Sequence, residues 1–283
     1  MVAINETVTK IAIQTMRNKF DKLTSIELGE SRLQMIKPPK EFSVLGLPIH
    51  VTTEYPGYLL KRLQQRMGTH VVTLNAEMTM QAERNETLAT IIKAADLVIP
   101  DGAGIVLYLR LLLKQDVRRI PGIELAEALL GEIGQNSPSS TVFFYGGKPG
   151  IAATAAQFWQ KKIPSLRIAG THSGYHSPEE EQKLHSTLSQ LQPKVIYVGL
   201  GVPRQELWIK QNRHLCPQAI WIGVGGSFDI WSGEKTRAPA WLGDRNLEWL
   251  YRLYQEPWRW RRMLALPKFA FKAFIYGIKT KGA

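Results

Sequence analysis

The sequence predicts the α/β fold class, with a parallel sheet that carries helices on both faces. Five short apolar runs, each closed by small or turn residues, recur along the chain, and segments that fit helices lie between them. Apolar runs that lack polar alternation are typical of strands buried on both faces. The order strand, loop, helix, repeated along the chain, favours parallel strands joined by right-handed crossovers, so the expected sheet is Rossmann-like.

The expected elements follow one another from residue 71 onward. The strands are expected at residues 71–75, 96–102, 141–147, 194–201 and 219–226. The helices are expected at residues 77–95, 122–132, 149–161 and 178–190, with a further helix beginning near Ala103. These helical segments supply the crossovers that parallel strands require.

The chain divides into three expected parts around this core. Residues 1–40 have weak helical periodicity and end in Pro38 and Pro39, which cannot continue a helix, so we expect an N-terminal extension there. Residues 41–240 form the expected α/β core. Residues 241–283 form an expected helical appendage that is rich in basic and aromatic side chains.

The composition is that of an ordinary globular protein. The 283 residues are 44% hydrophobic, which is enough for a sizeable core. The single cysteine, Cys216, excludes an intrachain disulfide and a thiolate metal cluster, and we expect an inert thiol. His172 and His176 flank a turn instead of sharing a helix face, so we expect no metal site.

The net charge of +12 calls for an anionic partner. Residues 245–283 hold nine Lys and Arg, two acidic residues and nine of the 26 aromatic residues. This mixture favours a peripheral contact with an anionic membrane surface over plain packing or nucleic-acid binding. No apolar stretch approaches the roughly 20 residues of a spanning helix, and no signal peptide is recognised, so a cytoplasmic protein at the inner face of the cell membrane is expected.

Candidate site residues follow the expected strands, where ligands bind to parallel sheets. Asp101 follows the second strand and is a candidate general base, although an aspartate there also suits the cap of the next helix. Glycine loops suit phosphate binding, although each alone also suits a tight turn. Their glycines are Gly146, Gly147, Gly199, Gly201, Gly225 and Gly226. Because no D-x-D occurs, arginines must neutralise any diphosphate in place of a metal.

Eight motifs together resemble the WecG/TagA/CpsF family of glycosyltransferases, in order from about Glu41 to Arg262. They are TLNAE (73–77), ADLVIPDG (95–102), RIPG (119–122), YGG (145–147), GLGVPRQE (199–206), GVGGSFD (223–229), RAP (237–239) and EWLYRLYQEP (248–257). Many relatives have Asp after the PG or TG dipeptide, whereas this chain has Ile123 and Glu124. This departure bears on the choice of donor or acceptor.

The resemblance implies an inverting, metal-independent transferase without a cofactor. Its donor would be a UDP-sugar carrying N-acetylmannosamine or its uronic acid, and its acceptor polyprenyl-diphosphate-linked N-acetylglucosamine, in cell-surface polysaccharide synthesis. The resemblance makes Asp101 the base. It places Thr73, Asn75, Arg119 and Gln205 in the same pocket, and Arg252, Arg259 and Arg262 on the donor diphosphate.

Two other function classes stay open at this point. A dinucleotide-dependent oxidoreductase also uses a parallel sheet with glycine loops, but it needs an acidic residue placed for a ribose. A non-catalytic binder of anionic lipid explains the basic appendage, but it leaves Asp101, Thr73 and Gln205 without roles. Self-association of the soluble form is open as well.

Overall fold

The computed structural model describes residues 33, 35–245 and 247–281 and divides the chain into two compact units, residues 1–37 and 38–283. Most of the expected N-terminal extension lies outside the described residues. The sheet and the candidate site lie in the second unit.

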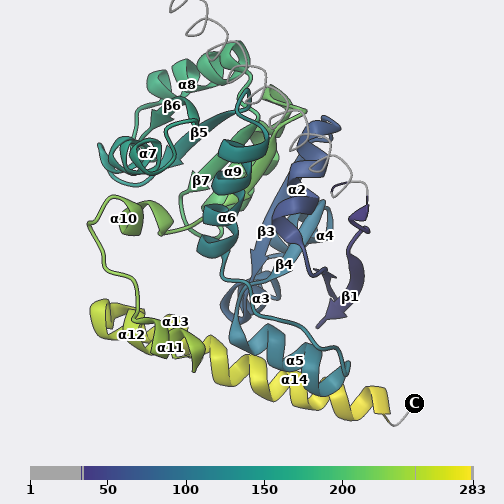
Figure 1. The fold of residues 1–283 in the computed structure, drawn as a ribbon. Helices are drawn as coiled ribbons and strands as arrows, with labels where there is room; N and C mark the ends of the chain where they lie inside the picture. The colour runs from purple at the N-terminus through teal and green to yellow at the C-terminus, as the bar shows by residue number, and fades with distance from the viewer. Residues whose placement is uncertain (1–32, 34, 246, 282–283) are drawn as a thin grey trace, which may run out of the picture. The chain divides into compact units, whose positions relative to one another are not determined.

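The core is a six-stranded parallel sheet of order β4-β3-β8-β7-β5-β6, as Figure 1 shows, which confirms the predicted fold class. Its strands are β3 (Thr69–Leu74), β4 (Leu97–Pro100), β5 (Thr141–Gly146), β6 (Arg167–His172), β7 (Val195–Gly199) and β8 (Ile220–Gly223). A separate antiparallel hairpin joins β1 (Lys40–Val44) and β2 (Leu47–Val51).

Helices connect the strands, and several of them form an appendage after the last strand. The connecting helices are α2 (Tyr55–Gln64), α3 (Ala76–Ala82), α4 (Glu86–Lys93), α5 (Ala103–Leu112), α6 (Gly122–Asn136), α7 (Ile151–Lys162), α8 (Pro178–Leu191), α9 (Arg204–Asn212) and η1 (Arg213–Leu215). After β8 come α10 (Ser227–Trp231), α11 (Ala240–Asp244), α12 (Glu248–Gln255), η2 (Pro257–Arg259), α13 (Trp260–Met263) and α14 (Ala265–Lys281).

The central strands are buried on both faces because successive side chains point to opposite sides. Phe143 of β5 packs with Leu184 of α8 and Ile209 of α9 in one hydrophobic cluster. On the opposite face the ring of Phe144 stacks on that of Phe228 in α10, with centroids 5.3 Å apart. Tyr197 of β7 donates a hydrogen bond of 3.1 Å to the Ala126 carbonyl of α6 on that face. The unbroken apolar runs in the sequence therefore reflect strands covered from two sides.

Three elements differ from the sequence-based expectation. The single helix expected at 77–95 is two helices, because the Asn85 side chain accepts the Leu88 N–H at 3.0 Å and starts α4 anew. Strand β6 was not predicted, because it is a half-exposed edge strand that contains Gly170 and lacks an apolar run. The β1–β2 hairpin was not predicted either.

Strand register brings two of the candidate site residues together. Leu74 pairs with Pro100, so Asn75 and Asp101 leave neighbouring strands at the same edge of the sheet. The loops after β7 and β8 open at this carboxyl edge too, because all six strands are parallel. The candidate functional groups therefore gather at the carboxyl ends of β4, β3, β8 and β7, which are neighbours in the sheet.

The appendage helices lie along this carboxyl edge, with α14 beside α3 and α5, as Figure 1 shows. Phe269 of α14 is 3% exposed and its ring lies 6.3 Å from that of Tyr108 in α5. The appendage is thus anchored to the core by apolar packing. Within the described part of the chain, none of the helices combines the length and hydropathy that crossing a bilayer requires.

Candidate functional site

Asp101 is held at the end of β4 by three hydrogen bonds. Its N–H donates to the Leu74 carbonyl at 3.0 Å, its carbonyl accepts from Arg119 Nε at 3.1 Å, and its Oδ1 accepts the Gly122 N–H at 2.8 Å. The carboxylate therefore faces the first residue of α6, not the helix that follows it. Gly102 is the N-cap of α5, without a side-chain cap. The alternative role of Asp101 as the cap of the next helix is therefore wrong.

The surroundings of Asp101 make its carboxyl more basic than that of an ordinary aspartate. Burial raises its pKa, and the Gly122 N–H, Arg252 and Arg119 oppose this rise only in part. A carboxylate with a raised pKa accepts a proton more readily, which suits a general base. The geometry also leaves Oδ2 outside the hydrogen bond to Gly122.

Thr73 and Asn75 stand beside Asp101 in one cavity of about 200 Å³, which we call the central cavity. Asn75 Oδ1 accepts the Met78 N–H at 2.9 Å and caps α3, so its amide has a fixed orientation. Thr73 is 8% exposed and packs so closely on Gly122 that a Cβ there would lie 2.9 Å from Thr73 Cγ2. Both residues are thus rigid parts of the cavity wall.

The central cavity brings together most of the residues predicted from the sequence. In addition to Thr73, Asn75 and Asp101, the predicted residues that line it are Gly201, Gln205, Gly225, Gly226, Arg252, Arg259 and Arg262.

Gln205 joins two glycine loops at the wall of the central cavity. Its Oε1 accepts the N–H groups of Gly201 at 3.2 Å and Gly225 at 3.1 Å. Its Nε2 donates to Glu206 Oε1 at 3.0 Å, and Glu206 Oε2 lies 2.8 Å from His70 Nε2. Sequence analysis missed Glu206 and His70, because the two are 136 residues apart. Together they fix the amide orientation of Gln205.

Gly146, Gly147 and Gly199 do not line the central cavity. The Gly147 N–H donates to the Gly199 carbonyl at 3.1 Å, and a Cβ on Gly146 would lie 2.4 Å from that carbonyl oxygen. These glycines allow the ends of β5 and β7 to approach each other. Their expected contact with a phosphate stays a prediction.

The three predicted arginines of the appendage reach the central cavity from α12, η2 and α13, and each forms an ion pair. Arg252 binds Glu248 at 2.6 Å, Arg262 binds Glu77 at 2.5 Å, and Arg259 binds Glu256. These carboxylates position the guanidinium groups without exhausting them, because a guanidinium has five N–H donors in a planar fork. The remaining donors are available to an oxyanion.

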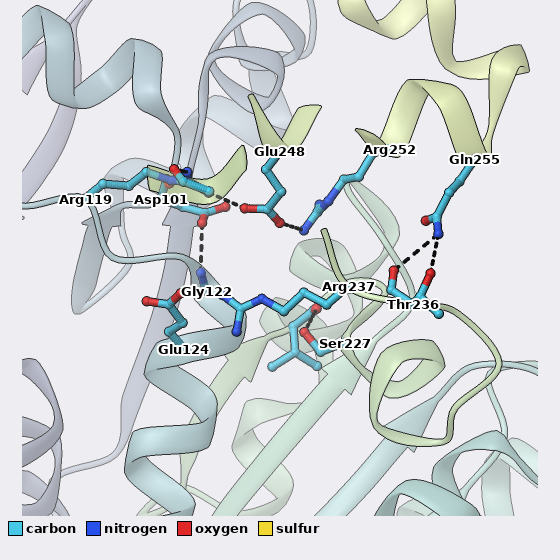
Figure 2. A network of polar contacts seen from close by, with 12 residues as sticks. Asp101, Arg119, Gly122, Glu124, Ser227, Thr236, Arg237, Glu248, Arg252 and Gln255 are labelled. Carbon is cyan, nitrogen blue, oxygen red and sulfur yellow. Dashed lines mark hydrogen bonds and ion pairs between the residues drawn. The ribbon is translucent and has the colours of Figure 1, made fainter. Parts of the chain in front are cut away.

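Arg119 lies behind Asp101 and does not line the central cavity. Figure 2 shows it beside Asp101, with Glu248 between Arg119 and Arg252. Burial tends to raise the pKa of Glu248, but Arg252 and Arg119 outweigh burial and lower it. Glu248 is therefore an ionised carboxylate that ties the appendage to the core. It was not predicted as a site residue, although it begins the last motif.

Two further cavities adjoin the central one. The lateral cavity, of about 480 Å³, is lined by Leu107, Arg118, Glu124 and others. The α5–α13 cavity, of about 280 Å³, lies between α5 and the appendage and includes Asp101. Glu248 lines all three cavities, and Arg119 lines the lateral and α5–α13 cavities. Glu248 and its ion pairs therefore stand where the three cavities meet.

Charged residues on the segment after α10 complete the rim of the central cavity. Lys235 donates to Asp229 at 2.7 Å and to Glu256 at 3.1 Å, and these carboxylates raise its pKa against the effect of burial, which lowers it. Arg237 pairs with Glu124, one of the two residues at which a departure from many relatives is expected. Figure 2 shows this pair close to Gly122. The departure thus lies at the wall between the central and lateral cavities.

The residues that raised the question of a metal lie elsewhere. The rings of His172 and His176 are 5.2 Å apart, and His176 Nε2 lies 2.8 Å from the Tyr145 hydroxyl. Among the residues that the structure describes, no group of three or more His, Cys, Asp or Glu could hold a metal ion. Cys216 is buried, and burial raises its pKa to about 11.

Comparison with known proteins finds one family and close relatives. A family model described as "Glycosyl transferase WecG/TagA/CpsF family" matches residues 42–283. The chain is 35% identical over 219 residues to the N-acetylglucosaminyldiphosphoundecaprenol N-acetyl-beta-D-mannosaminyltransferase of Bacillus subtilis, covering 77% of this chain and 84% of that protein. It is 36% identical over 220 residues to the protein of the same name from Bacillus spizizenii, covering 78% and 81%.

Proposed function

Because the chain belongs to the WecG/TagA/CpsF family of glycosyl transferases, we propose that it transfers N-acetylmannosamine, or its uronic acid, from UDP to polyprenyl-diphosphate-linked N-acetylglucosamine. The transfer inverts the anomeric centre and uses no metal ion. Membership of this family makes the protein a hexosyltransferase, which excludes the oxidoreductase and the non-catalytic lipid binder. The product belongs to a cell-surface polysaccharide pathway.

The observation that carries the proposal is the combination of a basic carboxylate and anion-binding groups in one cavity. Asp101, whose pKa is raised, shares the central cavity with Arg252, Arg259 and Arg262. The Gly201 and Gly225 loops, which Gln205 joins, lie on the same wall and allow a ligand to approach the backbone closely. A sugar nucleotide presents a diphosphate and an electrophilic carbon, which require such a set.

Asp101 acts as the general base of the transfer. The carboxylate accepts the proton of the acceptor hydroxyl while the hydroxyl oxygen attacks the anomeric carbon from the face opposite UDP. The new C–O bond forms as the bond to the β-phosphate oxygen breaks, and UDP leaves with both electrons of that bond. Arg252, Arg259 and Arg262 stabilise the negative charge that develops on the diphosphate, which is the role that a metal ion has elsewhere.

The exposed side chains of the appendage support a peripheral attachment to an anionic membrane. Trp258 is 71% exposed, Trp260 54%, and Phe271 and Phe274 each 66%. We call these four residues the aromatic surface. Arg261 is also exposed, with its guanidinium 5.4 Å from the Trp260 ring centroid. Exposed aromatic and cationic residues on short helices are typical of interfacial binding, and a lipid-linked acceptor requires such a position at the inner face of the cell membrane.

The test is UDP release from a panel of UDP-sugars, with and without the polyprenyl-diphosphate N-acetylglucosamine acceptor in anionic vesicles. We expect release that depends on the acceptor, occurs with UDP-N-acetylmannosamine or its uronic acid, persists in EDTA, and yields the inverted anomer by NMR. Acceptor-independent release, a requirement for a divalent ion, or retention of configuration would each contradict a stated part of the proposal.

A further inference from the structure

The α5–α13 cavity reaches Asp101 without the glycine loops. It is bordered by Asp101 and by the N-terminus of α5 on the core side, and by α12, η2, α13 and the start of α14 on the appendage side. The loops that contain Gly201, Gly225 and Gln205 line the central cavity but not this one. Asp101 therefore lines two adjoining cavities that differ in the rest of their walls.

The lining of the α5–α13 cavity combines three kinds of side chain. Asp101 and Asn75 are polar, Arg119 and Arg252 are cationic, and the appendage adds Trp249, Met263 and Leu266. Of these last three, Trp249 is 38% exposed and the other two are half-buried. A ligand that fits this lining combines a hydroxyl, a diphosphate and an apolar chain.

The central cavity also has apolar lining residues, such as Ile123 and Ile230, but it adds groups that the α5–α13 cavity lacks. Its walls hold the glycine loops, Gln205, Lys235 and Arg262, which suit a polar nucleotide sugar. Arg252 and Arg259 line both cavities and can contact a phosphate in either. Arg119 lines the α5–α13 cavity and not the central cavity, so it distinguishes the two.

We propose that the α5–α13 cavity is the acceptor subsite, in which a prenyl diphosphate-linked sugar binds with its hydroxyl at Asp101, its diphosphate at Arg119 and Arg252, and its first isoprene units at Trp249, Met263 and Leu266. This assignment rests on the proposed function. The volume of about 280 Å³ lies just below the usual range of about 300 to 1,000 Å³ for small-molecule sites, so the cavity encloses only the head of such a ligand. The rest of the prenyl chain stays in the bilayer, next to the aromatic surface.

The geometry also explains how one carboxylate serves two substrates. A nucleotide sugar in the central cavity and a lipid-linked sugar in the α5–α13 cavity meet at Asp101, which lines both. The lateral cavity is the rival for the acceptor, because it too combines arginines with apolar residues, but Asp101 does not line it.

The test compares three variants that each introduce one carboxylate. Met263→Glu places it in the α5–α13 cavity, Leu107→Glu in the lateral cavity, and Ala270→Glu on α14, where the side chain is exposed and lines none of the three cavities. Initial rates are measured with the full-length protein and a short-chain prenyl diphosphate-linked N-acetylglucosamine that is soluble without vesicles. Membrane attachment then does not influence the KM values.

We expect Met263→Glu to raise the KM for this acceptor by about tenfold or more, since its charge repels the diphosphate and disfavours the prenyl chain. The KM for the nucleotide sugar stays unchanged, which also shows that the variant is folded. Ala270→Glu and Leu107→Glu leave both constants unchanged.

The assignment would be overturned if Leu107→Glu raised the acceptor KM and Met263→Glu did not, or if Met263→Glu behaved like Ala270→Glu. It would also be overturned if Met263→Glu raised the KM for the nucleotide sugar instead. In all these cases the unmodified protein still transfers sugar, so the proposed function stands. Absence of transfer by the unmodified protein would overturn both proposals.

Discussion

Replacement of Asp101 by Asn separates the catalytic role of this residue from its structural role. The amide oxygen of Asn still accepts the Gly122 N–H, which Asp101 Oδ1 accepts at 2.8 Å, so the local fold is retained. The variant cannot accept the acceptor proton. Because a positioned general base contributes about 10²- to 10⁴-fold to a rate, we expect kcat to fall by that factor while the Kd for UDP stays unchanged.

The same replacement has an opposite effect on stability. Burial raises the pKa of Asp101 in the folded protein above its ordinary value of 3.8, so the folded state disfavours the ionised form. The free energy of unfolding therefore falls as the pH rises from 3.8 to the raised pKa of the folded protein. Above that pKa the destabilisation by the buried charge is fully present. Asp101→Asn removes this cost, and we expect a free energy of unfolding at pH 7 that is equal to or higher than that of the unmodified protein.

The assay combines sugar transfer, calorimetric UDP binding and urea unfolding, each on Asp101→Asn and on Asp116→Asn. Asp116 is exposed, lines none of the three cavities and is a matched control for the loss of one carboxylate. In the unmodified protein, kcat/KM should rise with pH through the raised pKa of Asp101, above the range of an ordinary aspartate. A kcat of Asp101→Asn within tenfold of the control would refute the assignment of the base.

Three further predictions concern the charged residues around the cavity. Arg262→Ala should raise the KM for the nucleotide sugar by about tenfold in initial-rate assays, whereas Arg261→Ala, which lines none of the three cavities, should not. Glu248→Gln should lower the free energy of unfolding in urea by about 2 kcal/mol, because Arg119, whose side chain is 18% exposed, loses its ionic partner but keeps a hydrogen bond. His70→Ala should lower it by about 3 to 5 kcal/mol, since the buried Glu206 carboxylate then loses its partner at Oε2 and keeps only the neutral Gln205 amide at Oε1; a loss below 1 kcal/mol would contradict this.

Much of the site could be predicted because its residues follow strand ends. Asn75 and Asp101 come directly after β3 and β4, Thr73 lies in the last two residues of β3, and in a parallel sheet all such positions share one edge. The same reasoning located the loops of Gly201 and Gly225. The order of the strands was not needed for this, because the carboxyl ends meet at one edge in any order.

The parts that were missed depend on contacts between distant segments. The partner of Gln205 is its neighbour Glu206, but the role of that carboxylate is visible only with His70, which comes from another strand. Likewise, the sequence identifies Arg252 but not that Glu248 ties it to Arg119. Patterns along a chain identify residue types at an edge, whereas ion pairs depend on tertiary geometry.

The glycine loops illustrate a second reason why part of the site could not be predicted from the sequence. A glycine between a strand and a helix serves equally for the approach of a ligand or of another backbone. Gly201 and Gly225 line the central cavity, whereas Gly146 sits against the Gly199 carbonyl. Spacing alone does not distinguish these cases, because the distinction depends on which strands are neighbours.

The carboxylate partners of the three appendage arginines also affect selectivity. A cavity lined by unpaired guanidinium groups would concentrate every small anion of the cell, including inorganic phosphate. Here Glu248, Glu256 and Glu77 compensate part of this charge in advance. An ion that offers only charge therefore gains less in such a site, whereas a sugar nucleotide adds contacts through its base and sugar. The net charge of +12 still attracts anions to the protein, and the paired carboxylates make the site itself discriminate among them.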